Sequence, residues 1–388
     1  MAGSGGARRR RAGFVAFSVA ASAGLLAFLV TTVSGSAASP TPSNSTAPLP
    51  EASTITLQGT AYTPQAPAGG GTDDYHCTLV DPHVTADSFI VASQFFPQSP
   101  EVHHAILFLV PPDLAAQAQQ ADGGGKGWTC FGETPLPGSN LTQISDTPWL
   151  TAWAPGHGQD VEPSGTGVPF PKGSLVVMQV HYNMLVGDAP VASKLELDTV
   201  PATDHLKALS LDLLPAPPDI PCPAGVSGPL CDRSASLADL AQRTGRDQAQ
   251  FVSLLESVCG RNPLDPPAAD TTSCSWSIPP GKIVRLTAHM HLLGQSMKVV
   301  LNPGTPNAKT LLDVPNYNFD YQRSYNLSVP VTAPAGSRMQ VTCSFDPTLR
   351  QKLPQLRTLP ARFVTWGDGS SDEMCLAIVQ YIGPKPVI

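Results

Sequence analysis

The stretch KIVRLTAHMHLLG, Lys282–Gly294, alternates between two sets of side chains in the way that a β-strand requires. The apolar set comprises Val284, Leu286, Ala288, Met290 and Leu292. The polar set comprises Arg285, Thr287, His289 and His291. We expect the apolar set to face the core and the two histidines to point together away from it. Imidazoles one strand repeat apart, about 7 Å between Cα atoms, can close on one metal ion, which would need at least a third ligand.

The composition of the whole chain fits an all-β protein. Its 388 residues include 41 prolines and 33 glycines, so the sequence favours short strands and turns over long helices. The hydrophobic content of 41% is ample for sizeable cores and excludes a disordered chain. The net charge is −7 and the arginine-rich stretch is confined to the N-terminus, so we expect no nucleic-acid partner.

Residues 1–38 predict an export segment. Four consecutive arginines, Arg8–Arg11, precede an uncharged apolar run over 13–33, and small residues follow it. The run is also just long enough to span a bilayer, so a cleaved signal peptide and an uncleaved N-terminal membrane anchor are both retained as expectations. The eight cysteines agree with an oxidising compartment. We therefore expect a secreted or extracytoplasmic protein, associated with a membrane if the anchor is kept.

The rest of the chain divides into a linker and two β-rich halves. Residues 39–52 are rich in Ser, Thr and Pro and predict a flexible tether. We expect two tandem antiparallel β-sandwich domains, jelly-roll-like, over 53–214 and 215–388. Within the second, the Pro-rich and Cys-bearing segment 215–274 carries a helical pattern and predicts a small helical insert.

Two further strand-like runs carry histidines. In SLVVMQVHYNM, Gln179 and His181 alternate with an apolar face. That apolar face comprises Val176, Met178, Val180 and Tyr182. In EVHHAILFLV, His103 and His104 are adjacent and should face opposite sides of a sheet. Both reach one ion only if the strand starts or bulges there, or if one imidazole coordinates through its nearer nitrogen. Otherwise one is buried and the other exposed.

A methionine would add the soft ligand that favours copper among first-row metals. Met374 starts a strand-like run after a Gly/Ser turn and precedes Cys375, where it would be held firmly. Met290 lies between two histidines but should face the core. The remaining histidines are interpreted as ordinary surface residues: His76, His83, His157 and His205.

Taken together, these segments resemble the type II copper, ascorbate-dependent monooxygenases, which include peptidylglycine α-hydroxylating and dopamine β-monooxygenases. HHAILF, QVHYN, AHMHLLG and SDEMC occur in the order of that family, and AWAPG at 152–156 also resembles it. The resemblance covers most of residues 75–385, and the composition favours a bacterial member.

The resemblance implies two separate mononuclear copper sites per chain. The electron-transfer copper would be bound in the first domain by His103, His104 and His181. The oxygen-activating copper, where dioxygen and substrate meet, would be bound in the second domain by the catalytic residues His289, His291 and Met374. Gln179 would either hydrogen-bond near the first site or simply be polar on a wet face. Ascorbate or an equivalent external reductant would support hydroxylation of a C–H bond in a small-molecule or peptide-like organic substrate.

The resemblance also implies two disulfides. They would join Cys77 to Cys130 in the first domain, and Cys343 to Cys375 beside the methionine ligand. The other four cysteines allow three pairings. Proximity in the sequence favours Cys222–Cys231 and Cys259–Cys274.

Two other functions are compatible with the histidines. A copper-binding or electron-transfer protein on the same fold would hydroxylate nothing. A zinc hydrolase is disfavoured because the chain lacks an HExxH motif and a plausible general base beside the histidine pairs.

The expected substrate pocket departs from that of the peptide-hydroxylating relatives. Those proteins anchor a terminal carboxylate with residues at the places that Thr287, Leu376 and Ile378 occupy here. Without a charged donor, binding of a carboxylate would lose several kcal/mol. Arg285 could replace that donor only by reaching about 7 Å along the strand. We therefore expect a neutral or less polar substrate and negligible turnover of glycine-extended peptides.

Overall fold

A computed structural model describes the chain over residues 51–66, 72–130, 136–137, 148–185 and 187–383. The predicted export segment and nearly all of the predicted linker lie outside these residues. All described residues belong to one compact unit, Thr46–Ile388. Among them, no helix combines the length and the apolar character that crossing a membrane requires.

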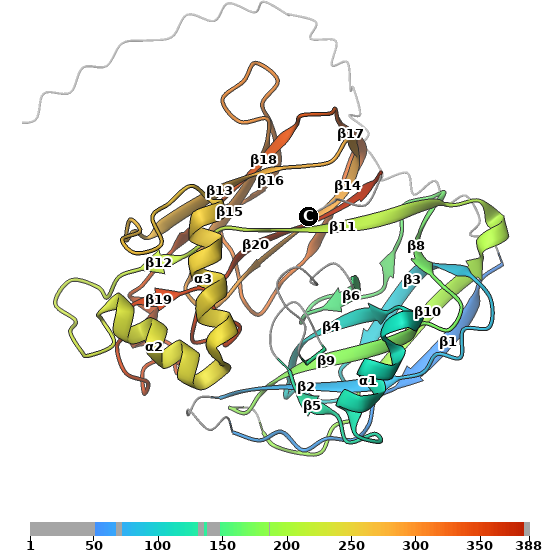
Figure 1. Ribbon diagram of the computed structural model, residues 1–388, viewed down its shortest axis with the longest axis horizontal. Coiled ribbons are helices and arrows are strands. Elements are labelled where there is room, and N and C mark those ends of the chain that lie inside the picture. Colours follow the sequence, from blue (N-terminus) through green and yellow to red (C-terminus); the bar gives the residue numbers. More distant parts are fainter. Residues whose placement is uncertain (1–50, 67–71, 131–135, 138–147, 186, 384–388) are drawn as a thin grey trace, which may run out of the picture. The chain divides into compact units, whose positions relative to one another are not determined.

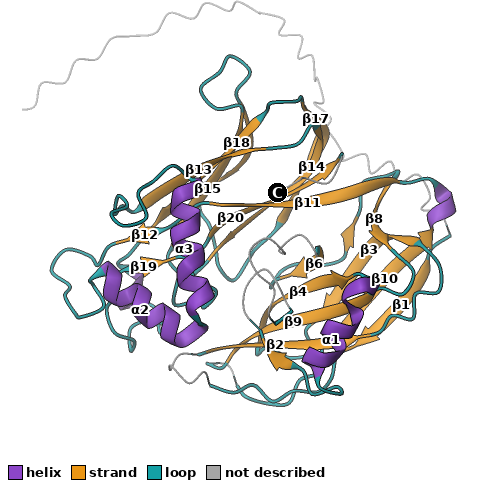
Figure 2. Cartoon of the chain, viewed as in Figure 1, coloured by secondary structure: helices purple, strands orange, loops and turns teal. Residues whose placement is uncertain are grey.

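The prediction of an all-β fold is confirmed, because antiparallel sheets dominate the described residues (Figure 2). The strands of the N-terminal half are β1 Ser53–Gln58, β2 Asp73–Val80, β3 Ser88–Phe96, β4 Val102–Val110, β5 Trp128–Thr129, β6 Trp149–Trp153, β7 Asp160–Val161, β8 Thr166–Phe170, β9 Leu175–Asn183 and β10 Lys194–Pro201. Those of the C-terminal half are β11 Lys207–Pro215, β12 Asp219–Ile220, β13 Thr271–Ser277, β14 Gly281–Met290, β15 Gly294–Leu301, β16 Lys309–Val314, β17 Ser324–Ala333, β18 Arg338–Phe345, β19 Val364–Thr365 and β20 Cys375–Ile382. The α-helices are α1 Ala115–Asp122, α2 Arg233–Thr244, α3 Arg246–Val258 and α4 Leu349–Lys352.

Each half has two sheet layers with a core between them. In the N-terminal half, a sheet in the order β5-β2-β9-β4-β6 packs against β1-β10-β3-β8. Leu107 of β4, Val180 of β9 and Leu197 of β10 meet in this core. In the C-terminal half, β13-β18-β15-β16 packs against β11-β20-β14-β17 around Val299 and Leu286.

One sheet runs through both halves (Figure 1). Strand β11 pairs in parallel with β8 at its start and then antiparallel with β20 along its length. The predicted boundary at residues 214 and 215 therefore falls at the end of a strand that hydrogen-bonds mainly to the C-terminal half. The division into two domains stays a prediction.

A third core cluster lies between the two halves. It joins Phe108, Trp149 and Val177 of the N-terminal half to Leu376 and Ile378 of β20. The faces of β9 and β20 that point away from their own sandwich cores are thereby covered by each other's half rather than by solvent.

The alternation expected for β14 holds over most of the strand. Leu286, Ala288 and Met290 lie in the C-terminal core as predicted. At the start of the strand, however, Ile283 takes the core position expected for Val284. The reason is a register shift between Ile283 and Arg285, which occurs in the pairing with both β17 and β20.

The predicted insert contains helices α2 and α3, which pack on each other, and α2 also contacts β19. Helix α1 beside β2 was not anticipated from the sequence. The cysteines form four disulfides with the pairings expected from the resemblance and from proximity. These are Cys77–Cys130, Cys222–Cys231, Cys259–Cys274 and Cys343–Cys375.

We predict that the Cys343–Cys375 bridge is structural. Both cysteines are fully buried and 32 residues apart in sequence. Replacing both by serine should lower the free energy of unfolding of the copper-free protein by about 2–4 kcal/mol, as denaturant titration would measure.

The Cys222–Cys231 pair provides the matched control, because it closes a loop of only 9 residues. Its double serine variant should lose about 1 kcal/mol less, since a shorter loop removes less chain entropy from the unfolded state. A free thiol at Cys375 in the native wild-type protein would contradict the assignment.

Candidate metal centres

A bulge in β4 brings three histidines of the N-terminal half together. His104 lies opposite His181 across the β4–β9 pair, and the register shifts between Val102 and His104. Adjacent histidines in a strand can reach one ion where the strand bulges, and this register shift is such a bulge. Each of His103, His104 and His181 offers a ring nitrogen, and these atoms all lie within 4.8 Å of one another. All three side chains are buried.

The second ring nitrogens fix the orientation of two of these imidazoles. His181 Nε2 donates to Asp73 Oδ1 at 2.8 Å, and His103 Nε2 lies 3.4 Å from Asp320 Oδ1. The Nδ1 atoms of His103 and His181 are buried and have no hydrogen-bond partner. A metal ligand whose far nitrogen donates to a carboxylate has this arrangement. These orphaned Nδ1 atoms therefore fit a bound cation.

Burial favours the neutral form of two of these imidazoles, His104 and His181, and the neutral form is the one that binds a metal. Burial lowers the pKa of His104 well below its usual value, and the neighbouring His181 adds to the shift. Burial also lowers the pKa of His181, against the opposing effect of Asp73. Burial acts to raise the pKa of Asp73, but the hydrogen bonds with His181 and Ser370 and the charge interactions with His181 and His291 together lower it.

A second cluster forms where β14 ends and β20 begins. His289, His291 and Met374 line one cavity of about 30 Å³, and the two imidazole centroids are 5.2 Å apart. His289 Nδ1 donates to Gln322 Oε1 at 2.8 Å, which leaves Nε2 as its free lone pair. Burial lowers the pKa of His289 to about 4 and that of His291 well below its usual value.

Glu373 holds the two segments of this cluster together. Its carboxyl oxygens accept from the backbone N–H groups of His291 at 2.9 Å, Leu293 at 2.8 Å and Met374 at 2.9 Å. Burial raises the pKa of Glu373 to about 8, although these hydrogen bonds act in the other direction. Met374 is therefore fixed beside the histidine pair through one neighbouring side chain.

The two clusters adjoin each other. The rings of His104 and His289 contact edge to face at 5.9 Å between centroids. The cavity of about 30 Å³ is lined by His104 and Gln179 from the N-terminal half as well as by the second cluster. The sequence predicts two separate ligand sets, one in each half of the chain. In the fold, His104 of one set contacts His289 of the other.

The loop that precedes Met374 also holds the first cluster. Ser370 Oγ donates to Asp73 Oδ1 at 2.6 Å, the same oxygen that accepts from His181. The Tyr75 hydroxyl donates to the carbonyl of Asp368 at 2.6 Å, while its ring stacks on His181 at 4.2 Å. The loop that leads to Met374 of the second cluster therefore also bonds to two side chains that orient His181 of the first cluster.

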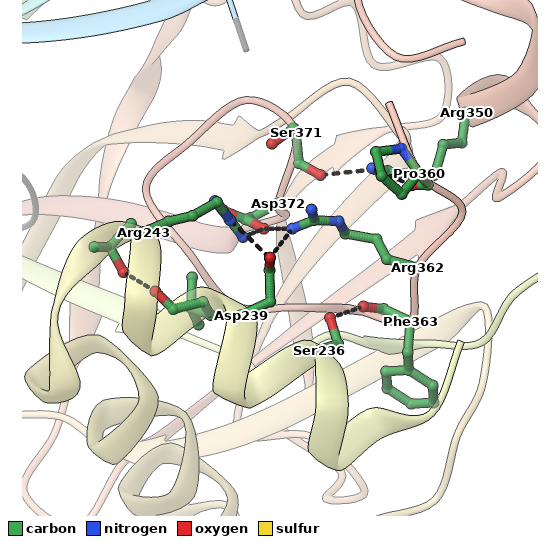
Figure 3. Close-up of polar contacts among 11 residues, drawn as sticks. Ser236, Asp239, Arg243, Arg350, Pro360, Arg362, Phe363, Ser371 and Asp372 are labelled. Carbon is green, nitrogen blue, oxygen red and sulfur yellow. Dashed lines mark hydrogen bonds and ion pairs between the residues drawn. The ribbon is translucent and has the colours of Figure 1, made fainter. Parts of the chain in front are cut away.

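The helical insert fixes the same loop from outside (Figure 3). Arg243 of α2 donates to both carboxylate oxygens of Asp372, at 2.8 and 3.0 Å, and also to Asp239. Arg350 donates to the carbonyl of Ser371 at 2.9 Å. Bidentate pairing of this kind restrains both distance and orientation.

Two interpretations of polar residues are corrected by the structure. His76 is not a surface residue, because it lies in β2, is 6% exposed and stacks on Tyr62 with centroids 3.5 Å apart. Gln179 is 2% exposed, so the wet face proposed for it is wrong. His157 is partly buried and its Nε2 accepts from the Ser324 backbone N–H at 3.0 Å. His83 and His205 are exposed as expected.

Sequence reasoning missed the residues that orient the ligands: Asp73, Tyr75, Gln322 and Glu373. A signal existed for the first two, because they alternate with Cys77, whose disulfide places that face of β2. Nothing comparable marks Gln322, which lies in the turn before β17.

The donor types fit copper. One cluster offers three imidazoles, and the other offers two imidazoles with a thioether, a soft ligand that favours Cu(I). All eight cysteines are in disulfides, so no thiolate competes as a ligand.

Comparison with known proteins finds a family match in the C-terminal part of the chain. Residues 269–387 match the family model for the copper type II ascorbate-dependent monooxygenase, C-terminal domain. No curated protein matches the chain.

Solved structures resemble the chain only weakly. An allantoicase is 10% identical over 70% of this chain and 74% of its own, with a TM-score of 0.18. The allantoicase of Saccharomyces cerevisiae is 9% identical over 79% and 77%, with a TM-score of 0.20. A tandem CBM22 domain from Paenibacillus barcinonensis is 9% identical over 78% and 81%, with a TM-score of 0.17. Likenesses at these TM-scores carry no argument about this chain.

We predict that Asp73 supports metal binding at the first cluster. Asp73→Asn should weaken copper binding by about 10–100-fold, the usual effect of losing a carboxylate that orients a histidine ligand. Ser370→Ala should cause a smaller loss, because Ser370 acts only through Asp73. Competition with a chelator of known affinity would measure both.

Ser371→Ala is the matched control for the neighbouring serine. Ser371 contributes a backbone carbonyl, which the substitution leaves in place, to its bond with Arg350. Its copper affinity should equal that of the wild type. Wild-type affinity in Asp73→Asn would contradict the role given to this carboxylate.

Proposed function

Since residues 269–387 match the family model for the copper type II ascorbate-dependent monooxygenase, C-terminal domain, we propose that this chain is an exported copper monooxygenase. It hydroxylates a C–H bond of an organic substrate with dioxygen and an external reductant. The observation that carries the proposal is the contact between a three-histidine cluster and a His-His-Met cluster inside one protein.

The reaction balances with ascorbate or an equivalent as the electron donor. The C–H bond, dioxygen, two electrons and two protons give the C–OH bond and water. Copper bound at the two clusters would supply the one-electron redox chemistry that reduces dioxygen beside the substrate. We assign the electron-transfer ion to His103, His104 and His181, and the oxygen-activating ion to His289, His291 and Met374.

The side chains of this chain hold the ligands and exclude water. Asp73 and Gln322 fix the rotation of His181 and His289 through hydrogen bonds to one ring nitrogen of each. Glu373 places Met374 against His291. The enclosing faces bury the imidazoles of both clusters, which limits access of bulk solvent to a reactive oxygen species.

Export is supported by the four disulfides, which are typical of extracellular or secreted proteins. Cleavage of the predicted signal, or its retention as an anchor, belongs to residues outside the described part of the chain. The alternative function, a copper protein without hydroxylase activity, shares the fold and the metal. Oxygen consumption matched by hydroxylated product separates the two.

We predict that the copper-loaded wild type binds two coppers per chain and that Met374→Ile abolishes oxygen consumption while keeping the copper of the first cluster. The substitution removes the thioether and leaves the three imidazoles of the N-terminal half untouched. Metal analysis and an oxygen electrode, with ascorbate as reductant across a substrate screen, would measure both quantities.

Met290→Leu is the matched control. Met290 lies between the two histidines in sequence, but its side chain is in the C-terminal core. A substitution that conserves volume there should cost less than about 1.5 kcal/mol and retain both coppers and activity. One copper in the wild type, or unchanged turnover in Met374→Ile, would refute the assignment.

A further inference from the structure

A second cavity adjoins the metal clusters. It has a volume of about 90 Å³ and shares His104, Ile106, Trp149 and His289 with the cavity of about 30 Å³ between the clusters. Its apolar lining includes Leu211 and Ile378. Arg285 and Gln380, which pair across β14 and β20 and lie away from His289 along β14, belong to a polar end of the lining together with Asp160 and Glu162.

The cation at the polar end is already engaged. Arg285 Nε donates to Asn326 Oδ1 at 2.7 Å, and its NH2 group donates to the carbonyl of Val161 at 2.8 Å. The guanidinium also lies 3.8 Å from Asp160 and 3.5 Å from Glu162. Two carboxylates therefore face one cation, and Arg285 is the only lysine or arginine among the described residues that line this cavity.

Two buried acceptors at the same end can each accept a further hydrogen bond. Glu162 Oε2 and Gln380 Oε1 are buried and accept no hydrogen bond from the described residues, although Glu162 Oε2 lies 3.5 Å from Arg285 in an ion pair. The side chain of Glu162 is 8% exposed, and both residues line the cavity. Leaving a buried acceptor unsatisfied is unfavourable, and most so for a charged group. A ligand that supplies donors here would remove this cost.

A carboxylate has the opposite chemistry. It would bring two further acceptors and a negative charge to a region that already holds two carboxylates and a single cation. Like charges brought together in a desolvated site cost several kcal/mol. The same end of the cavity would thus favour donors and reject anions.

We propose, building on the proposed monooxygenase function, that this end of the cavity binds the hydrogen-bond-donating head, a hydroxyl or an amine, of a substrate with an apolar body. Glu162 and Gln380 accept from the head, while Arg285 holds Glu162 in place. The apolar part then extends along the wall formed by Trp149 and Ile378 toward His289. The structure thus assigns to Glu162 and Gln380 the selection of substrates by head group.

The test uses binding to the copper-free protein, so that it does not depend on oxygen chemistry. The probes share a five-carbon chain and differ in the head: 1-pentanol, pentylamine, 1-methoxypentane and pentanoate. Trp149 and Trp153 line the cavity, so their fluorescence reports occupancy, and calorimetry gives the dissociation constants independently. We expect the alcohol and the amine to bind at least tenfold more tightly than the ether and the carboxylate.

Variants locate the effect. Glu162→Gln keeps the shape of the side chain, removes a charge and adds a donor. Pentanoate should therefore bind about tenfold more tightly than to the wild type, and pentylamine about tenfold more weakly. Gln380→Met removes the second acceptor and should weaken the alcohol several-fold; it serves as the test if Glu162→Gln does not fold. Glu196→Gln, at a carboxylate outside the cavity that pairs with Lys194, should leave all four constants unchanged.

Equal binding of pentanoate and pentanol to the wild type would overturn the proposal. Unchanged head-group preference in both cavity variants would also overturn it. Failure of the monooxygenase function is distinguishable, because it would appear as absent oxygen consumption with the binding preferences intact.

Discussion

Three hydrogen bonds to one fully buried carboxyl group, that of Glu373, are the constraint on which the second metal cluster depends. They tie the turn after β14 to the residue before β20, two segments far apart in sequence. If the carboxyl group were lost, three backbone donors would be buried without partners, at about 1–3 kcal/mol each. The Cys343–Cys375 bridge restrains the same place from β18, a strand of the facing sheet. His291 and Met374 can therefore share one site without any direct bond between them.

The fold could be predicted where alternation is local. The alternation around His181 predicts one face of a strand in a core and the other face turned away from it. Strand β9 has this arrangement. The pairing of β11 with β8 could not be predicted, since it joins distant strands and leaves no local pattern. The register shift at Val284 could not be predicted either, because it arises where β14 pairs with both β17 and β20.

The candidate ligands could be picked out from the sequence, whereas the residues that orient them could not. Histidine and methionine stand out in apolar runs, whereas Asp73 and Tyr75 lie in a strand with two acids and few aliphatic residues at its start. Because β2 was not recognised as a strand, the direction of the His76 side chain could not be predicted. In the fold, Tyr75 faces the cluster while His76 faces Tyr62, as neighbours in a strand must. The register of β2 against β9 therefore decides which of these side chains belongs to the site.

Burial of the ligands follows from how the two halves cover each other. On β9, the face opposite the sandwich core carries Val177, which lies in the third core cluster, and the same face continues to His181. On β20, Leu376 and Ile378 also lie in the third core cluster, and Met374 lies beside them. Each half thus turns a mixed face inward, and the polar residues on it enter a region of low dielectric constant. Neutral imidazoles tolerate that region, but a metal cation bound by them brings a charge that burial opposes. Asp73, bonded to His181 and held in its ionised form, lies where it offsets that charge.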